Sequence, residues 1–320
     1  MSFGLVIPVW NDQAALTQLL DQVCQMDIFE QVVVIDDGSD VPVVLPALPG
    51  IDVHLVRNAV ARGAGPARNI GLEHITTQHV LFFDSDDQVT PELALLWHDL
   101  QDQHFDFCIF RHCDSRQMHR GHWGMMGHDT GLWRTAGVIG KALQTLTAPA
   151  EAQLAQTSNF PWNKIWRTKF LHDHNIRYSD IRVHEDIVPH WMGFLHANTI
   201  LASDRVAALH YVSSDADRLT NVQGPERLAV FAPLEQVMSY CAVAPDNKSA
   251  LRPAFVRFTC DLLDWIHGNL DSRWHGDLSA KRRVFWQTAV PPIFFDQLAA
   301  HDPALALHMT LQMMKEPVQC

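Results

Sequence analysis

The 320-residue chain has no excess of positive charge and no apolar run long enough to cross a bilayer. Its 24 Lys and Arg against 36 Asp and Glu give a formal net charge of −12. This charge disfavours a nucleic-acid backbone or an anionic membrane as the main partner. An anionic ligand would therefore need a local cation, from Arg, Lys or a metal ion. The short apolar run near the N-terminus has no basic region before it, so it predicts a first strand rather than a signal peptide.

Cysteine is also scarce. The six cysteines are scattered, and no Cys-x-x-Cys pair occurs. In a chain of this length such usage indicates reduced thiols and a cytoplasmic setting rather than a disulfide scaffold. With 47% hydrophobic and 19% charged residues, the composition is that of an ordinary globular protein. It has room for one large or two modest domains.

Strand and helix patterns alternate through the first hundred residues. Apolar runs typical of buried strands are followed by segments with helical spacing or helix-start residues. The expected strands are 3–9, 31–35, 51–56 and 79–83, and the expected helices are 14–26, 63–74 and a segment after Thr90. This alternation predicts an α/β fold with right-handed crossovers and a mostly parallel sheet. In such sheets ligands bind beyond the carboxyl ends of the strands.

The rest of the chain continues with mixed elements and ends in helices. From Pro225 onward the pattern is helical. We therefore expect an α/β domain over residues 1–220 and a C-terminal helical extension over residues 221–320. Between the two patterns the sequence predicts strands at 105–110, 199–202 and 205–212, helices at 135–146, 150–155 and 187–195, and a loop followed by a helix at 160–174.

Two of the expected strands end in acids. The strand at 31–35 runs into Asp36 and Asp37, and the strand at 79–83 runs into DSDD, residues 84–87. Three carboxylates within four residues repel one another, and burying them unpaired is costly. Either they form a solvated turn, or they hold a cation that has an anionic group behind it.

Six motifs follow one another along the chain: IPVWND, VVVIDDGSD, ARGAGPARNIGL, LFFDSDD, NKIWRTKFL and VHEDI. The ordered set resembles a family-2 nucleotide-sugar glycosyltransferase of the bacterial surface-polysaccharide type. This resemblance covers residues 3–215 and implies the GT-A fold, a Rossmann-like, mostly parallel sheet with flanking helices. It also implies a metal-dependent, inverting enzyme. Such an enzyme moves a sugar from a nucleoside-diphosphate sugar, most commonly a UDP-sugar, to a hydroxyl of a glycan or glycolipid.

The resemblance assigns a donor site to the ends of the first strands. Asp36 or Asp37 would accept a hydrogen bond from a base N–H such as uracil N3. Glycines at the start of the next helix permit close backbone approach, and the N-terminus of that helix favours an anion. Arg68 can pair with Asp84 or reach the nucleotide. The alternatives are a capped turn at the two aspartates and a solvated arginine on a surface helix. The residues expected to bind the nucleotide sugar are Pro8, Asp36, Asp37, Arg62, Arg68, Asp84 and Ser85.

The DSDD segment matches the family's Asp-x-Asp motif. Its oxygen ligands suit Mn²⁺ or Mg²⁺, and such a cation would neutralise the leaving nucleoside diphosphate. Asp86 is the expected direct ligand and Asp84 a second. His210, at the end of a late strand, corresponds to a histidine that some relatives add to the metal shell. The alternatives are a capped turn for the acids and a core position for His210.

Glu185 and Asp186 resemble the family's Glu-Asp pair at a helix start. Inverting transfer needs a base that deprotonates the acceptor hydroxyl. The resemblance gives this role to Asp186, with Glu185 orienting it. Two acids in a first helical turn also stabilise a helix without any catalytic role. Lys164, in the NKIWR motif, is expected either to steady a phosphate or to be a solvated cation.

Several readings stay open at the level of sequence. The His-rich stretch 98–128 has no compact zinc spacing, and in the implied fold it would lie beside the acceptor pocket. A lipid-linked saccharide acceptor would bring the C-terminal helices into peripheral contact with the inner face of the cell membrane. Other functions are a non-catalytic scaffold of the same fold that binds a nucleotide or a partner, and an aspartate-dependent phosphohydrolase whose nucleophile is the first acid of DSDD.

Overall fold

A computed structural model describes residues 1–140, 142–212 and 222–314. It contains a mixed nine-stranded sheet with the order β3-β2-β1-β4-β8-β6-β9-β5, and β7 pairs with β9. The strands are β1 (Phe3–Val9), β2 (Gln31–Asp36), β3 (Asp52–Arg57), β4 (His79–Phe82), β5 (Gln88–Val89), β6 (Phe107–Asp114), β7 (Gln144–Thr145), β8 (Lys164–Arg167) and β9 (Ile200–His210).

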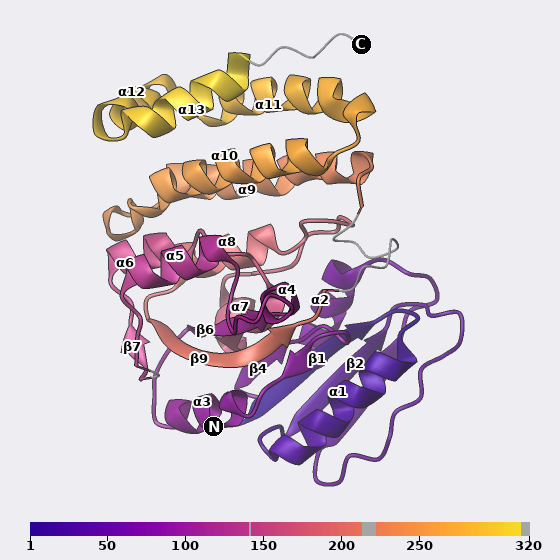
Figure 1. The fold of residues 1–320 in the computed structure, drawn as a ribbon. Coiled ribbons are helices and arrows are strands. Elements are labelled where there is room, and N and C mark those ends of the chain that lie inside the picture. The colour runs from indigo at the N-terminus through magenta and orange to yellow at the C-terminus, as the bar shows by residue number, and fades with distance from the viewer. Residues whose placement is uncertain (141, 213–221, 315–320) are drawn as a thin grey trace.

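Helices cover both faces of this sheet, and the later helices stack as further layers (Figure 1). The α-helices are α1 (Gln13–Met26), α2 (Ala64–His74), α3 (Glu92–Leu100), α4 (Ser115–Met118), α5 (Gly127–Ala136), α6 (Ala148–Leu154), α7 (Thr168–Asp173), α8 (Ile187–His196), α9 (Phe231–Ala242), α10 (Leu251–Asn269), α11 (His275–Ala289), α12 (Pro292–His301) and α13 (Pro303–Met314). The 3₁₀ helices are η1 (Pro161–Asn163), η3 (Pro225–Val230), η4 (Asp246–Lys248) and η5 (Ser272–Trp274).

The predicted fold class is confirmed. Strands β3, β2, β1 and β4 are parallel neighbours, and β6 pairs in parallel with β9. Strand β1 is buried along its whole length, as the continuous apolar run predicted. Helix α1 begins where expected, because the Asp12 side chain accepts a hydrogen bond from Ala15 N at 3.2 Å.

Two local predictions are wrong. Residues 135–146 do not form one helix, because α5 ends at Ala136, Gly137 follows at φ +74°, and β7 occupies 144–145. The segment 160–174 contains strand β8 before helix α7. Strand β8 runs antiparallel between β4 and β6, and Trp166 packs on Phe107 with ring centroids 4.7 Å apart. This long-range pairing decides the structure there, and it leaves no local signal.

The apolar core lies on both sides of the sheet. One cluster joins the sheet to α1 and α3. The other runs continuously from Val6 of β1 through α8 to Met309 of α13, so the C-terminal helices share the core of the sheet's other face. The C-terminal helical region is thus present as expected, whereas the expected boundary at residue 220 lies outside the described residues. In the part of the chain that the model describes, no helix has the length and apolar character needed to span a membrane.

Candidate active site

The acids predicted from the sequence meet at one edge of the sheet. Strand β1 lies between β2 and β4, with Val9 opposite Asp36 and Val6 opposite Phe82. The carboxyl ends of these three parallel strands therefore lie side by side. The turn after β2 and the DSDD segment after β4 flank the end of β1.

Asp36 folds the turn that follows β2. Its carboxylate accepts hydrogen bonds from Ser39 N at 2.9 Å and Val43 N at 3.3 Å, and it pairs with the Arg57 guanidinium. Burial raises the pKa of Asp36, but these donors outweigh burial and the net pKa lies below the ordinary value. The side chain is 1% exposed, so its observed contacts are all internal.

Asp37 fastens the loop that leads into α2. Its carboxylate accepts hydrogen bonds from Arg62 N at 2.9 Å, Gly63 N at 2.7 Å and Asn58 Nδ2 at 2.7 Å. Asp37 is 4% exposed. Like Asp36, it holds the surrounding loop through internal hydrogen bonds, as the capped-turn alternative from the sequence has it.

Arg68 of α2 connects the two acidic motifs. Its Nη2 lies 2.5 Å from Asp84 Oδ1, and its Nη1 lies 2.9 Å from Glu185 Oε1. The guanidinium also lies 5.1 Å above the Tyr178 ring. Burial lowers the pKa of Arg68, but the two carboxylates outweigh burial and raise it above its usual value. Of the two predicted contacts, the structure therefore shows the pair with Asp84 and adds a pair with Glu185.

The glycines before Arg68 serve two different needs. Gly63 has φ +99°, which favours glycine. Gly65 instead lets the start of α2 lie close to the segment that contains Ser179 and Glu185. A Cβ atom on Gly65 would lie 2.5 Å from the Ser179 carbonyl oxygen and 3.0 Å from Glu185 Cβ. The start of α2 thus packs directly on the segment that carries Glu185.

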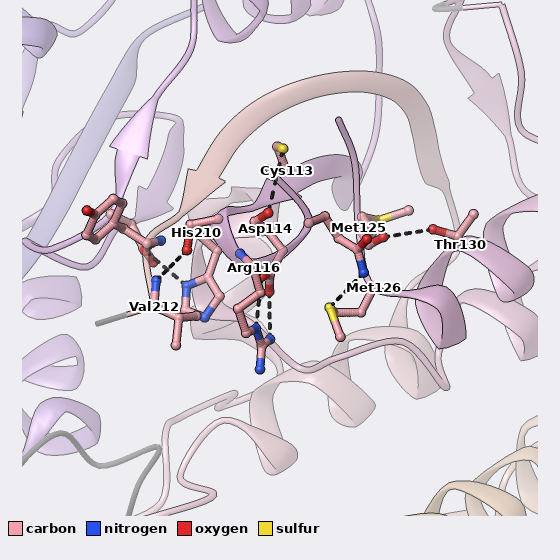
Figure 2. A network of polar contacts seen from close by, with 12 residues as sticks. Cys113, Asp114, Arg116, Met125, Met126, Thr130, His210 and Val212 are labelled. Carbon is pink, nitrogen blue, oxygen red and sulfur yellow. Dashed lines mark hydrogen bonds and ion pairs between the residues drawn. The ribbon is translucent and has the colours of Figure 1, made fainter. Parts of the chain in front are cut away.

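The last acid of DSDD is buried and paired. Asp87 Oδ1 accepts a hydrogen bond from Tyr211 N at 2.8 Å and lies 3.0 Å from His210 Nδ1. Burial lowers the pKa of His210, but Asp87 outweighs burial and raises it above the ordinary value. His210 also lies opposite Asp114 in the β6–β9 pairing, and Figure 2 shows it beside the ion pair of Asp114 with Arg116.

His210 is packed as well as paired. Its ring lies 4.8 Å from the Phe160 ring and 5.5 Å from the Trp162 ring. The core position weighed for His210 therefore matches its aromatic surroundings, and its place in a metal shell stays a prediction.

The remaining acids of DSDD are less buried than Asp87. The Asp84 side chain is 26% exposed, and Asp86 is partly exposed. Within residues 1–140, 142–212 and 222–314, no three His, Cys, Asp or Glu side chains converge as a metal site.

Asp186 occupies the N-cap position of α8, but its side chain makes no capping hydrogen bond. Helix capping therefore does not explain why an acidic residue stands at this position. Burial, reinforced by the neighbouring charge of Glu185, raises the pKa of Asp186 to about 8, against the opposing effect of Arg68 and Lys164. Such a carboxyl group has a proton affinity close to that needed of a general base near neutral pH.

Lys164 fits neither role expected from the sequence. It is 1% exposed, and its Nζ donates to Phe160 O at 2.8 Å and to Asn163 Oδ1 at 2.6 Å. Burial lowers the pKa of Lys164 to about 7, against the opposing charges of Asp186 and Asp129. Lys164 is therefore an internal amine that interacts electrostatically with Asp186, rather than a solvated cation.

The other predicted residues lie near the same edge. Pro8 is buried in β1 beside Ile35, and Ser85 is 9% exposed. The Arg62 side chain is 52% exposed and lies 3.4 Å from Asp180. Of these three, only Arg62 presents a largely exposed side chain.

Comparison with known proteins gives a family match. Residues 5–152 match the model of glycosyl transferase family 2. The chain is 37% identical over 94 residues to the pre-mycofactocin glycosyltransferase of Mycobacterium tuberculosis, which covers 29% of this chain and 19% of that protein. It is 25% identical over 214 residues to the poly(ribitol-phosphate) beta-N-acetylglucosaminyltransferase TarS of Staphylococcus aureus, which covers 62% of this chain and 34% of that protein. The matches thus span about a fifth and a third of these relatives.

Solved structures extend the likeness to almost the whole chain. The crystal structure of S. aureus TarS 1-349 in complex with UDP-GlcNAc has a TM-score of 0.75 at 18% identity, over 98% of this chain and 88% of that one. The mannosyltransferase PcManGT from Pyrobaculum calidifontis, in complex with GDP-Man and Mn²⁺, has a TM-score of 0.52 at 14% identity, over 98% and 86% of the two chains. At these identities the likeness concerns the fold.

Proposed function

Since the N-terminal part of the chain belongs to glycosyltransferase family 2, we propose that the protein transfers a sugar from a nucleoside-diphosphate sugar to a hydroxyl of a glycan or glycolipid, with inversion. The observation that carries this proposal is the Arg68 bridge, which joins Asp84 of the donor-side motif to Glu185, the neighbour of Asp186. Because the nearer structural relative was crystallised with UDP-GlcNAc, we take a UDP-sugar as the donor.

Asp186 acts as the general base in this proposal. The acceptor oxygen attacks the anomeric carbon from the side opposite the diphosphate, and its proton passes to the Asp186 carboxylate. The bond from the anomeric carbon to the diphosphate breaks, and the nucleoside diphosphate leaves. Arg68 holds Glu185 at 2.9 Å, so the neighbouring carboxylate stays in place while Asp186 gains the proton.

The donor is held at the carboxyl ends of β1, β2 and β4. Because Asp36 and Asp37 use their carboxylates internally, we propose that they act mainly by shaping the loops around the base. Pro8 and Ser85 line the same edge. In this proposal the Arg62 guanidinium contacts the diphosphate, because its side chain is largely exposed.

Mn²⁺ or Mg²⁺ fits the residues at this edge. Asp86 and Asp84 would hold the ion, which when bound neutralises charge on the leaving diphosphate. His210 would have to move to become a further ligand, because it does not converge with Asp84 and Asp86 on a metal site in the described part of the chain. A metal-binding histidine commonly gives its other ring nitrogen to a carboxylate. The Nδ1 of His210 faces Asp87 at 3.0 Å, which leaves Nε2 for a ligand.

A nucleotide screen tests the proposal. UDP, GDP and dTDP are each added with and without Mn²⁺ while the melting temperature is followed, and UDP-sugars are then assayed for release of UDP. We expect UDP with Mn²⁺ to raise the melting temperature most, because a ligand that binds only the folded state stabilises it by mass action. If no nucleoside diphosphate shifts the melting temperature, with or without metal, the proposal is wrong.

The same screen separates the other candidate functions. Nucleotide binding without turnover of any sugar would favour the non-catalytic scaffold. Release of phosphate from simple esters, abolished in Asp84→Asn, would favour the phosphohydrolase. Asp84 is ion-paired to Arg68 at 2.5 Å, and no observed contact marks it as a nucleophile.

A further inference from the structure

Helix α10 lies along the helix that carries the proposed base. Phe255, Phe258 and Trp265 of α10 share one face, because they are three and seven residues apart. Phe255 and Phe258 pack on Trp191 of α8, with ring centroids 4.8 and 5.3 Å apart. Farther along the same face, the Trp265 ring lies edge-on to His184 at 6.3 Å. Helix α10 thus contacts both α8 and the segment just before it, and it lies in the layer stacked on the one that holds α8 (Figure 1).

An arginine holds the Trp265 ring from another element. The Arg227 guanidinium, from η3, lies 4.6 Å above the ring. Arg227 is 1% exposed, and its Nε donates to the main-chain oxygen of Val222. Since a desolvated cation attracts an aromatic face more strongly than an exposed one does, this contact fixes the orientation of Trp265.

His184 has an unusual backbone conformation directly before the Glu185–Asp186 pair. Its φ is +69°, in the left-handed region that residues other than glycine seldom adopt. Such a conformation persists when surrounding contacts hold it. Among the described residues, the main-chain contacts at this point are Ser179 N to Glu185 O at 3.0 Å and Ile187 N to His184 O at 3.4 Å. The contact of the His184 ring with Trp265 adds a side-chain contact to these main-chain hydrogen bonds.

We propose that Trp265 and Arg227 are positioning residues for the base, because they hold His184 in its left-handed conformation and thereby fix where Asp186 points. This inference rests on the proposed function of Asp186. It gives the C-terminal helices a part in turnover as well as in stability. Trp265 is 44% exposed, whereas Phe255 is fully buried. The packing of α10 on α8 therefore survives a change at Trp265, and the two roles can be separated.

Kinetics of Trp265→Ala, Trp265→Phe and the double variant Trp265→Ala/His184→Gly test the proposal. We expect kcat of Trp265→Ala to fall about 10-fold, because a misplacement of about 1 Å can cost about 100-fold and Asp186 should move by less than that. Its KM for the donor should stay within about two-fold of the parent, because donor contacts are untouched. Trp265→Phe should retain most of kcat. The double variant should recover part of it, since glycine adopts positive φ without support from the ring.

The control is Val284→Ala, which removes a 56% exposed side chain from α11 and should behave like the parent. Parent-like kcat in Trp265→Ala overturns the proposal. So does an equal fall in kcat and donor affinity. If Trp265→Ala does not fold, Trp265→Leu keeps apolar volume without an aromatic face, and the same fall in kcat is expected of it.

Trypsin gives a readout that needs no substrate. Arg182 is exposed and lies two residues before His184. We expect cleavage after Arg182 to be several-fold faster in Trp265→Ala than in the parent or in Val284→Ala, because a loosened segment opens more often. Equal cleavage rates overturn the positioning role even in an active enzyme. A parent that binds no nucleotide but shows the faster cleavage in Trp265→Ala contradicts the proposed function alone.

Discussion

The carboxyl edge of the sheet and the helical layers above it are stabilised differently. At the edge, charges are buried against one another: Arg68 against Asp84 and Glu185, and His210 against Asp87. In the helical layers most contacts are apolar, and aromatic pairs such as Trp191 on Phe255 join neighbouring helices. Buried ion pairs add little net stability compared with apolar packing, but they fix geometry.

This difference agrees with the proposed location of the active site. Charges that are costly to bury are gathered where a diphosphate and a base would need them. The helical layers bury apolar side chains, and the packing of α10 on Trp191 holds α8 in position. Changes at the edge should therefore act mainly on turnover, and changes between the layers mainly on folding, apart from Trp265, which contacts His184 beside the proposed base.

Asp186→Asn should have the largest effect. We expect kcat to fall about 10³-fold, because loss of a general base typically costs this much, while nucleotide affinity stays at the parental value. Turnover is measured by UDP release, and affinity by titration with UDP and Mn²⁺. Asp173→Asn, an exposed acid on α7, is the control and should be fully active. Parental turnover in Asp186→Asn would remove the base assignment.

Lys248→Met should have the next largest effect, and on folding alone. Lys248 Nζ lies 2.6 Å from Glu151 Oε2, and both side chains are at most 10% exposed. Without Lys248 the Glu151 carboxylate stays buried and unpaired, which should lower the free energy of unfolding by about 3 kcal/mol. Urea denaturation measures this loss. Lys169→Met removes a surface pair with Asp173 and should leave the urea midpoint unchanged.

A pH profile should show a smaller effect of the same base. Because burial and Glu185 raise the pKa of Asp186 to about 8, the base carries its proton below that pH and cannot accept another. Activity should therefore rise with pH, and kcat/KM should increase about 50-fold between about pH 6 and about pH 8. An acid limb close to the ordinary carboxyl pKa would show that another group limits the rate.

The positions of the site residues were easier to predict from the sequence than the long-range strand pairing, because the site motifs are local. DSDD, the glycines before Arg68 and the Glu185–Asp186 pair each stand within a few residues of a strand or helix end, so their position followed from the α/β pattern. By contrast, β8 forms through pairing with β4 and β6, and residues far apart in the chain decide it. Expecting a loop and helix at 160–174 therefore missed it.

The contacts of individual side chains in the site also could not be predicted from neighbouring residues in the sequence. Asp36 and Asp37 follow a strand in the way that ligand-binding acids do, and the sequence left a capped turn as the alternative. The structure shows turn contacts, because their carboxylates accept hydrogen bonds from main-chain amides and from the Arg57 and Asn58 side chains. Lys164 resembles a surface cation until β8 places it in the interior. The contact of Trp265 with His184 joins residues 81 positions apart, and no spacing rule predicts it.

Gly65→Ala should give the smallest change that still distinguishes the two regions. The added Cβ would lie 2.5 Å from the Ser179 carbonyl oxygen and 3.0 Å from Glu185 Cβ, so the segment before α8 must shift. We expect about a 10-fold loss of kcat, because the base moves slightly while its chemistry is intact. Gly131→Ala on α5 is the matched control, since its Cβ meets nothing within 4 Å. Alanine there should favour the helix and leave turnover unchanged. Full activity in Gly65→Ala would mean that Asp186 tolerates movement of its segment, and that the close packing of α2 serves folding only.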